Sequence, residues 1–341
     1  MKKSLMTLGV LALFVLMAYG QEKKFALYSV AFYNMENLFD TIHDEGKNDY
    51  EYLPNGTNQW NTMKYKAKLK NMSEILSMLS TDKLPMGPAI IGVSEIENYR
   101  VLEDILKQPA LADRGYQYVH YEGADQRGVD CAFFYNPKLF ELTNSKLVPY
   151  VYINDTVHKT RGFLIASGNI AGEKMHFIVN HWPSRAAASP ARERAGKQVR
   201  AIKDSLLRED SAAKIVIMGD MNDDPMDKSM AVALGAKRKP ADVGPTDLYN
   251  PWWDTLKKGY GTLMYKGKWN LFDQIVFTGN LLGTDRSTLK FYKHEIFRRD
   301  FMFQKEGKYK GYPKRTQAGG VWLNGYSDHL PTIIYLIKEV K

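Results

Sequence analysis

The stretch Lys214-Ile-Val-Ile-Met-Gly-Asp-Met-Asn-Asp-Asp-Pro225 carries the strongest structural signal in the chain. Its apolar run ends in a glycine, an aspartate and an asparagine, a pattern typical of a buried strand followed by polar side chains. Because side chains alternate along an extended backbone, we expect Asp220 and Asn222 to lie on the same side of the chain. Functional sites in α/β proteins lie at the carboxyl ends of strands, which makes this pair a candidate for catalysis.

The same pattern recurs beside other predicted strands. The polar residues involved are Asn34, Glu36, Glu95, Glu97, His181, Asp273, Asp328 and His329. Carboxylates, amides and imidazoles at strand ends indicate metal-assisted hydrolysis of a phosphoester. One such group would be a weak signal, but several in order along one chain make a strong one.

Hydrophobic periodicity predicts a mixed α/β chain. Strands are predicted at Phe25–Phe32, Ala89–Val93, Gln117–Tyr121, Asp130–Tyr135, Lys174–Val179, Lys214–Met218, Phe272–Phe277 and Thr332–Ile337. Helices are predicted at Met63–Ser80, Val101–Lys107 and Ala191–Leu207. Phe39–Asn61 and Phe291–Gly320 are predicted to be long irregular segments. Some neighbouring strands are joined too closely for a crossover helix, so we expect mixed sheets with helices outside them.

The first twenty residues are typical of a signal peptide. Lys2 and Lys3 precede the apolar run Leu5–Ala18, and Ala18-Tyr-Gly20 supplies small residues before a cleavage point. The run is short for a membrane span, although an uncleaved anchor stays an alternative. We therefore expect residues 1–20 to be removed, residues 21–341 to form one domain, and the protein to be periplasmic or extracellular.

The composition favours a polyanionic ligand. The chain has 47 basic and 38 acidic residues, a net charge of +9, and one cysteine, Cys131, which excludes an intramolecular disulfide. The segment Phe291–Gly320 mixes basic and aromatic residues, which suits a groove for a nucleic-acid backbone. A mobile, solvated loop has the same composition, so both interpretations stay open.

Gly219-Asp-Met-Asn222 and Ser327-Asp-His329 together, with weaker signatures around Asn34 and Glu95, resemble the endonuclease/exonuclease/phosphatase superfamily. The resemblance is to DNase-I-like metal-dependent phosphodiesterases of an exported bacterial type, and it extends from Asn34 to His329. It implies a four-layer sandwich of two facing mixed β-sheets flanked by helices, with the site at one edge.

Asp220 is expected to orient and deprotonate the attacking water, because in-line displacement needs a base opposite the leaving oxygen. His329 would donate to the phosphate oxygens as charge develops there. The resemblance implies that Asp273 fixes the tautomer of His329 and that His181 is the leaving-group acid. Asp130 is a candidate to orient His181.

Asn34 and Asn222 would donate to the non-bridging phosphate oxygens. Arg127 is a candidate phosphate clamp, with an exposed loop arginine as the alternative.

Glu95 is the expected metal ligand, with Glu36 and Asp328 completing the shell. Hard oxygen ligands favour Mg²⁺ or Mn²⁺ as the cofactor. Glu97 is an alternative to Glu95 because it lies two residues further along the chain and faces the same way. Glu36 departs from the aspartate common in the family, which leaves open whether its side chain reaches a metal.

The expected function is divalent-metal-dependent phosphodiester hydrolysis, with DNA or RNA as the substrate of an endonuclease. One alternative is hydrolysis of phospholipid head groups or small phosphoesters, for which Pro251-Trp252-Trp253 would be the only membrane contact and is more typical of buried packing. A second alternative is a catalytically inactive binding protein on the same fold. No stable protein partner is implied, and we expect a monomer.

Overall fold

The computed structural model describes residues 23–153 and 158–340. The predicted signal peptide, residues 1–20, lies outside the described residues. Two mixed sheets form the centre of the molecule, which confirms the predicted fold class. None of the helices in the described ranges is long and apolar enough to cross a lipid bilayer.

The first sheet has six strands in the order β14-β17-β1-β2-β4-β3. Its strands are β1 (Lys24–Leu38), β2 (Ile90–Ile96), β3 (Gln117–His120), β4 (Asp130–Tyr135), β14 (Lys290–Ile296) and β17 (Thr332–Val340). Within this sheet, β1 and β2 are the parallel pair, so their carboxyl ends reach the same edge of the sheet. The strand β17 runs antiparallel to β1 and begins at that edge, just after Asp328 and His329.

The second sheet has seven strands in the order β5-β6-β7-β8-β13-β10-β9. Its strands are β5 (Glu141–Val148), β6 (Phe163–Ile170), β7 (Glu173–His181), β8 (Lys214–Asp220), β9 (Ala236–Lys237), β10 (Leu248–Tyr249) and β13 (Asp273–Thr278). The strands β7 and β8 run in parallel and end together, with His181 opposite Asp220. The antiparallel β13 begins at the same edge, with Asp273 opposite Asp220.

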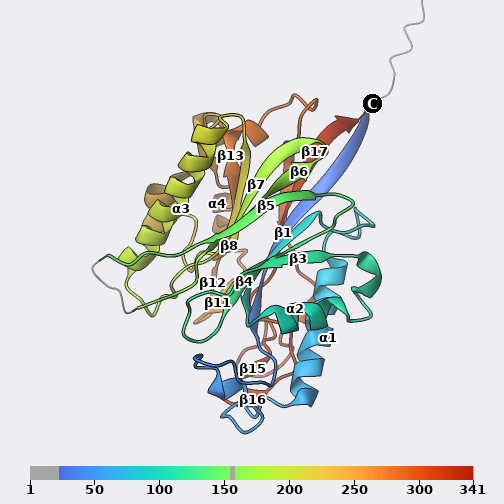
Figure 1. Ribbon diagram of the computed structural model, residues 1–341, viewed down its shortest axis with the longest axis vertical. Coiled ribbons are helices and arrows are strands. Elements are labelled where there is room, and N and C mark those ends of the chain that lie inside the picture. Colours follow the sequence, from blue (N-terminus) through green and yellow to red (C-terminus); the bar gives the residue numbers. More distant parts are fainter. Residues whose placement is uncertain (1–22, 154–157, 341) are drawn as a thin grey trace, which may run out of the picture.

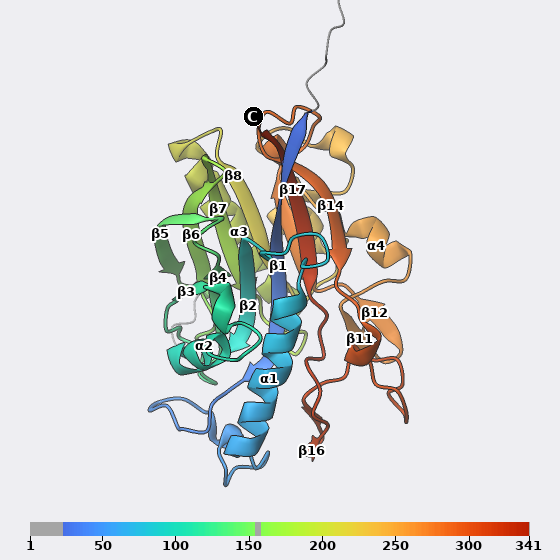
Figure 2. The same cartoon turned by 90° about the vertical axis from the view of Figure 1, so that its right-hand side faces the viewer.

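Helices cover the outer face of each sheet. The helices α1 (Thr62–Met78) and α2 (Tyr99–Leu106) pack on the six-stranded sheet, and α3 (Ser189–Glu209) packs on the seven-stranded sheet with a π-helix at Ser229–Leu234 (Figures 1 and 2). The short α4 (Trp253–Lys257) follows β10. Between the sheets lies a core that includes Phe32, Phe133, Phe177 and Met218. Residues alternate along each strand, so one face of a strand packs on this core and the other packs on helices.

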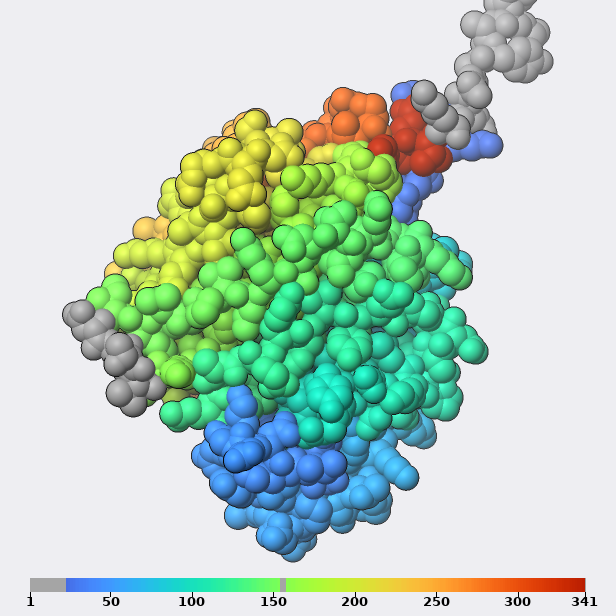
Figure 3. Space-filling view, viewed as in Figure 1, coloured from blue at the N-terminus to red at the C-terminus, as the bar shows by residue number. Residues whose placement is uncertain are grey.

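The sequence missed several strands of this architecture. The strands β5 and β6 were not predicted, because β5 is a largely exposed edge strand rich in polar residues and β6 contains a glycine and an asparagine. The predicted irregular segment 291–320 begins inside β14 and ends in the turn of a hairpin between β15 (Gln317–Ala318) and β16 (Val321–Trp322). A second small hairpin joins β11 (Leu263–Tyr265) and β12 (Lys268–Asn270). The segment 39–61 between β1 and α1 is irregular apart from one 3₁₀ turn, as predicted, and it covers the lower end of the molecule in Figure 3.

Candidate active site

Asp220 is the centre of the polar cluster at the shared edge of the two sheets. Its side chain is buried at the end of β8. The Oδ2 atom accepts a hydrogen bond from Asn34 Nδ2 at 3.0 Å and lies 3.7 Å from His181 Nε2 and 3.8 Å from His329 Nε2. Both sheets therefore supply nitrogen atoms close to the Asp220 carboxylate, since Asn34 is on β1 and His181 ends β7.

Burial and the neighbouring Asp273 raise the pKa of Asp220 to about 7, although the nearby His329 opposes the shift. The hydrogen bond from Asn222 N to Oδ1, at 2.9 Å, also favours the charged form. A carboxylate with a raised pKa is a stronger base than an exposed aspartate, and a pKa near the working pH suits proton abstraction.

His329 is held by Asp273. The Nδ1 and Oδ2 atoms of the pair are 2.7 Å apart, and both side chains are buried. Burial lowers the pKa of His329, but the carboxylates of Asp273 and Asp220 outweigh it and raise this pKa well above its ordinary value. A protonated imidazole with Nδ1 bonded to Asp273 presents its Nε2 proton to the site. The arrangement can donate to a negatively charged phosphate oxygen.

His181 has different surroundings. Its Nε2 lies 3.7 Å from both Glu95 Oε1 and Asp220 Oδ2, and its buried Nδ1 has no hydrogen-bond partner among the described residues. Burial and the positive charge of Arg161 lower the pKa of His181 well below its ordinary value. A neutral imidazole is a weak proton source, so in this state His181 is suited to donating an N–H hydrogen bond.

Asp130, the candidate to orient His181, contacts His120 and Gly123 instead. Its Oδ2 lies 3.3 Å from His120 Nε2 and accepts a hydrogen bond from Gly123 N at 3.0 Å. Together with Glu122, His120 and Asp130 form a second group of potential ligand atoms, outside the cluster around Asp220.

Arg161 was not predicted as a site residue, because it precedes β6 in a segment without a motif. Its guanidinium donates to Asp125 Oδ2 and to the carbonyl of Trp182, each at 2.9 Å, and the side chain is buried. This pairing places a fixed positive charge next to His181. Arg127, the predicted phosphate clamp, lies in the same loop as Asp125, and its side chain is 48% exposed.

Glu95 reaches the cluster because β2 has a bulge. The pairing of β2 with β4 shifts between Ser94 and Ile96, and Glu95 itself has a left-handed φ of 59°. Its carboxylate accepts hydrogen bonds from Asn34 Nδ2 at 3.2 Å and from Asn37 N at 3.0 Å. The bulge explains why Glu95 and Glu97, two residues apart, have different surroundings.

Glu97 lies away from the cluster. It is buried, accepts a hydrogen bond from Asp40 N at 2.7 Å, and has a pKa raised by burial to about 9. Asn98, beside it, caps α2 through Arg100 N.

Both carboxylate oxygens of Glu36 accept hydrogen bonds. Its oxygens accept hydrogen bonds from Arg315 Nε at 2.8 Å and Thr316 N at 2.7 Å, and Arg315 also lies 3.0 Å from Asp328. Burial and Asp328 raise the pKa of Glu36 to about 7. The buried Lys68 donates to Thr316 Oγ1 at 2.5 Å and partly offsets this charge. Arg315 thus links two predicted metal ligands and ties the segment after β14 to the site.

Asn222 follows the end of β8, so the alternation expected from the sequence stops at Asp220. It has a left-handed φ of 51°, and its side-chain amide donates to the Trp182 carbonyl at 3.0 Å. Asparagine tolerates this conformation better than most residues, which explains the residue type at this turn.

The donor set fits a divalent cation. Ligand atoms of Glu95, His181 and Asp220 lie within 4.8 Å of one another, and so do those of Asp220, Asp273 and His329. The buried Asp273 Oδ1 has no hydrogen-bond partner among the described residues, and Glu95 is partly open to solvent. Carboxylate oxygens predominate, as Mg²⁺ and Mn²⁺ require.

Solved structures of known proteins share this fold at low sequence identity. An endonuclease/exonuclease/phosphatase family protein from Bacteroides thetaiotaomicron superposes with a TM-score of 0.57 and 15% identity, covering 93% of this chain and 97% of that one. A mannosyl-6-phosphatase from the same organism has a TM-score of 0.56 and 15% identity, with coverages of 91% and 99%. D. rerio TDP2 complexed with a single-strand DNA product has a TM-score of 0.52 and 15% identity, with coverages of 91% and 99%.

No curated protein sequence is significantly similar to this chain. The profile of the Endonuclease/Exonuclease/phosphatase family, in contrast, matches residues 29–338. That match contains the signatures around Asn34, Glu95, Asp220 and His329, which the two sheets bring together. The chain therefore belongs to the endonuclease/exonuclease/phosphatase family, whose members are divalent-metal-dependent phosphoester hydrolases.

Proposed function

We propose that this protein is an exported, Mg²⁺-dependent phosphodiesterase that hydrolyses nucleic acid, with Asp220 as the base for the attacking water. The observation that carries the proposal is the convergence of Asn34, His181 and His329 on one buried carboxylate oxygen. A buried base flanked by three N–H donors suits in-line attack at phosphorus, because the base takes the proton of the water and the donors bind the phosphate oxygens.

The residues divide the work as follows. Asp220 orients the water and accepts its proton, and the charged His329 donates to the phosphate oxygens. Asn34 and His181 offer N–H groups to the same oxygens. Glu95, with Asp220, would hold the divalent cation, which when bound supplies charge neutralisation at the phosphate.

A basic face beside His329 supports nucleic acid as the substrate. Leu263, in β11, forms a bridge with His329, and the hairpin that it begins carries the exposed Lys266 and Lys268. At the tip of this hairpin, Gly267 N donates to Tyr312 OH at 2.6 Å. The exposed lysines of the adjoining segment are Lys305, Lys308 and Lys310. Such a surface attracts a phosphate backbone through counterion release.

A phospholipid substrate is less well supported. Trp252, in the only predicted membrane contact, is fully buried and donates from Nε1 to the Ile275 carbonyl at 2.9 Å. Trp253 is half-buried, so neither tryptophan of the Pro251–Trp253 turn is exposed in the way that interfacial binding uses.

The test is hydrolysis of plasmid DNA, RNA, sphingomyelin and bis-p-nitrophenyl phosphate with Mg²⁺, Mn²⁺ or EDTA. We expect the wild type to nick plasmid or cleave RNA in a metal-dependent way. This activity should be lost in Asp220→Asn and kept in the control Asp204→Asn, which lies on α3 and pairs with Lys203. Lys266→Glu/Lys268→Glu should weaken binding of both nucleic acids and reduce its salt dependence.

Turnover of sphingomyelin alone would reject nucleic acid as the substrate. For export, we expect the protein in the periplasm or medium to begin near Gln21, and a cell-associated protein that still begins at Met1 would contradict this.

A further inference from the structure

The β11–β12 hairpin connects the catalytic cluster to an exposed surface. At its base, Leu263 forms a β-bridge with His329 and pairs with Asn270 on the other strand. The side chain of Asn270 accepts a hydrogen bond from Arg185 Nη1 at 3.4 Å. Arg185 Nε in turn donates to the Asn222 carbonyl at 3.0 Å. The base of the hairpin is therefore fixed against the site, whereas its tip, residues 265–268, is exposed.

The two faces of this hairpin have different surroundings. Trp269 is half-buried on one face, where its ring centroid lies 6.4 Å from that of Phe303. Because side chains alternate along a strand, Tyr265 and its cross-strand neighbour Lys268 lie on the opposite face, together with Asn270. The side chain of Tyr265 is 62% exposed. An accessible aromatic ring thus lies on the face of the hairpin whose base contacts the site.

A second exposed tyrosine lies beside the tip of the hairpin. The side chain of Tyr309 is exposed, and its ring centroid lies 5.4 Å from that of Tyr312, whose hydroxyl accepts a hydrogen bond from the hairpin tip. Each exposed ring has a lysine next to it. Lys266 Nζ lies 5.3 Å from the ring centroid of Tyr265. Lys308 Nζ lies 5.5 Å from that of Tyr309.

We call this region the tyrosine surface; it consists of Tyr265, Lys266, Lys268, Lys308 and Tyr309. Its composition favours unpaired nucleotides over a duplex. In a duplex, neighbouring bases cover both faces of each base, so a ring on a protein surface has no base face to contact. An unpaired base can stack on a tyrosine, whereas lysines bind the phosphates of either form. The exposed rings are therefore the feature that distinguishes a single strand from a duplex.

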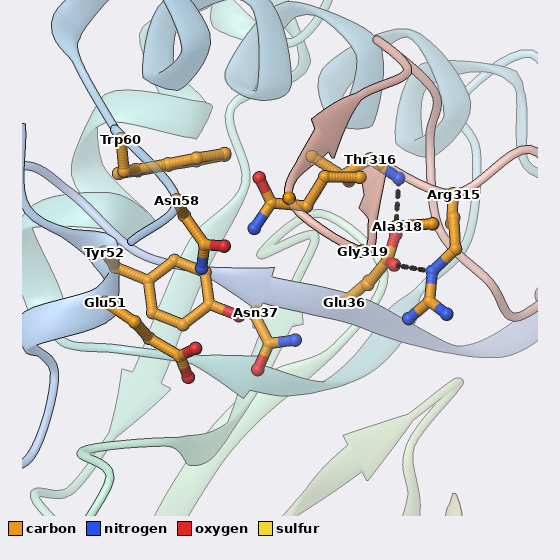
Figure 4. A pocket seen from close by; sticks show the side chains of 12 residues that line it. Glu36, Asn37, Glu51, Tyr52, Asn58, Trp60, Arg315, Thr316, Ala318 and Gly319 are labelled. Atoms are coloured by element: carbon orange, nitrogen blue, oxygen red, sulfur yellow. Dashed lines mark hydrogen bonds and ion pairs between the residues drawn. The ribbon is translucent and has the colours of Figure 1, made fainter. Parts of the chain in front are cut away.

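The pocket on the Glu36 side of the site is less suited to a nucleic acid. It is lined by the segment between β1 and α1 and by the β15–β16 hairpin (Figure 4). Its arginine, Arg315, is paired with Glu36 and Asp328. Glu51 adds an exposed carboxylate, which repels phosphate, and Trp60 is fully buried. A nucleic-acid strand therefore leaves the site more favourably over the tyrosine surface.

We propose that the tyrosine surface binds the unpaired nucleotides next to the phosphate under attack, and that the protein prefers single-stranded nucleic acid to a duplex. The inference rests on the proposed hydrolysis of nucleic acid and adds the form of the substrate. Tyr265 lies two residues along β11, roughly 7 Å, from Leu263, the bridge partner of His329. It therefore stacks on a base close to the reacting phosphate, and Tyr309 stacks on a base further along the strand.

The test measures binding of labelled oligonucleotides by fluorescence anisotropy in EDTA. The probes are a short DNA strand, an RNA strand of the same sequence and the DNA duplex. Wild type should bind the single strands at least tenfold more tightly than the duplex. Tyr265→Ala and Tyr309→Ala should each weaken binding of the single strands about tenfold, because each loses one stacked base, and should leave the Kd for the duplex unchanged. The single strand that binds more tightly identifies the preferred sugar.

Two matched variants separate stacking from other effects. Tyr265→Phe keeps the ring and should bind as wild type does. Tyr292→Ala removes another exposed tyrosine, on β14 beside Arg286, and should change none of the Kd values. Tyr265→Ala should also keep the salt dependence of wild type, because it removes no phosphate contact.

Equal Kd values of wild type for single strand and duplex would overturn the inference, as would an equal loss for both forms in Tyr265→Ala. If wild type with Mg²⁺ or Mn²⁺ still cleaved nucleic acid, the proposed function would stand without it. Failure of wild type to hydrolyse either form with these metals would instead reject the proposed function, and the inference with it. Tyr309→Ala keeps the test valid if Tyr265→Ala disturbs the hairpin, because Tyr309 lies outside β11 and β12.

Discussion

The two histidines of the site have opposite pKa shifts because their surroundings differ. His181 and His329 both approach Asp220 Oδ2, yet burial beside Arg161 lowers the pKa of the first, while Asp273 raises that of the second. One imidazole is therefore neutral and the other charged at the same pH. Opposite pKa shifts in neighbouring groups are a recurring way to separate roles in a hydrolytic site.

Replacing the base should abolish turnover without unfolding the protein. In Asp220→Asn the side chain keeps its shape and an oxygen for Asn34, but it cannot accept the proton of the water. We expect kcat to fall by about 10²- to 10⁴-fold. Steady-state kinetics on bis-p-nitrophenyl phosphate would measure this, with circular dichroism as the check on folding. A fall of less than threefold would remove Asp220 from the role of base.

The same variant should change how stability depends on pH. Burial raises the pKa of Asp220 from 3.8 to about 7, so the folded protein holds this proton more tightly than the unfolded chain does. Stability therefore falls as pH rises from about 4 to about 7, because ionisation is harder in the folded state. Urea unfolding in EDTA should show a smaller loss between these pH values for Asp220→Asn than for wild type. Parallel pH profiles would contradict the shift.

At the scale of elements, the site is built where strands stop being regular. Glu36, Asn37, Glu95 and Asn222 all have left-handed φ values between 46° and 59°. Each such residue costs of the order of 1 kcal/mol, and such strain collects at functional sites. At Glu95 the irregular backbone brings the carboxylate to the Asp220 cluster, whereas the side chains of Glu36 and Asn222 bond to Arg315 and to the Trp182 carbonyl.

The variant Asn222→Gly should show whether Asn222 is needed for its backbone conformation or for its side chain. Asn222→Gly accepts the left-handed φ, so the free energy of unfolding should change by less than about 1 kcal/mol. Loss of the side-chain amide, the predicted phosphate donor, should lower kcat by about 10²-fold. Asn324→Gly is the matched control, because Asn324 also has a left-handed φ, of 49°, and lies outside the cluster. Equal kinetic effects in both variants would refute a catalytic role for Asn222.

At the scale of the whole molecule, the active site joins two sheets. Asn34 and Glu95 come from the six-stranded sheet, whereas His181, Asp220 and Asp273 come from the other. The apolar core between the sheets fixes their relative position, so the catalytic distances depend on packing across the entire sandwich. A cation bound between these groups would connect the two halves.

Metal binding should therefore stabilise the fold. A ligand that binds only the folded state adds about 2.7 kcal/mol to the free energy of unfolding at one hundred times its Kd. Thermal melts should show a higher Tm in Mg²⁺ or Mn²⁺ than in EDTA. Glu95→Gln should remove most of this shift and Glu97→Gln should retain it, since Glu97 bonds to Asp40 outside the cluster. The reverse result would make Glu97 the ligand.

The sequence alone identified the fold class and the positions of most polar residues at strand ends. Strong apolar runs such as that of β8 determine strands regardless of context, and Asp220 follows directly from such a run. The edge strand β5 was missed because few of its side chains are buried, so its sequence lacks the apolar signal. Segment 291–320 was misassigned in part because β14 mixes charged and aromatic residues at half-buried positions.

Tertiary structure decided what each site residue touches. The sequence could not distinguish Glu95 from Glu97, because a bulge in β2 separates their surroundings and no local pattern marks it. It gave no sign of Arg161 or Lys68, whose partners lie 36 and 248 residues away along the chain. Side-chain type is local information and determined the chemistry available to this protein. Charge state and contact depend on the groups that folding brings together from distant segments, and these only the packed sheets could supply.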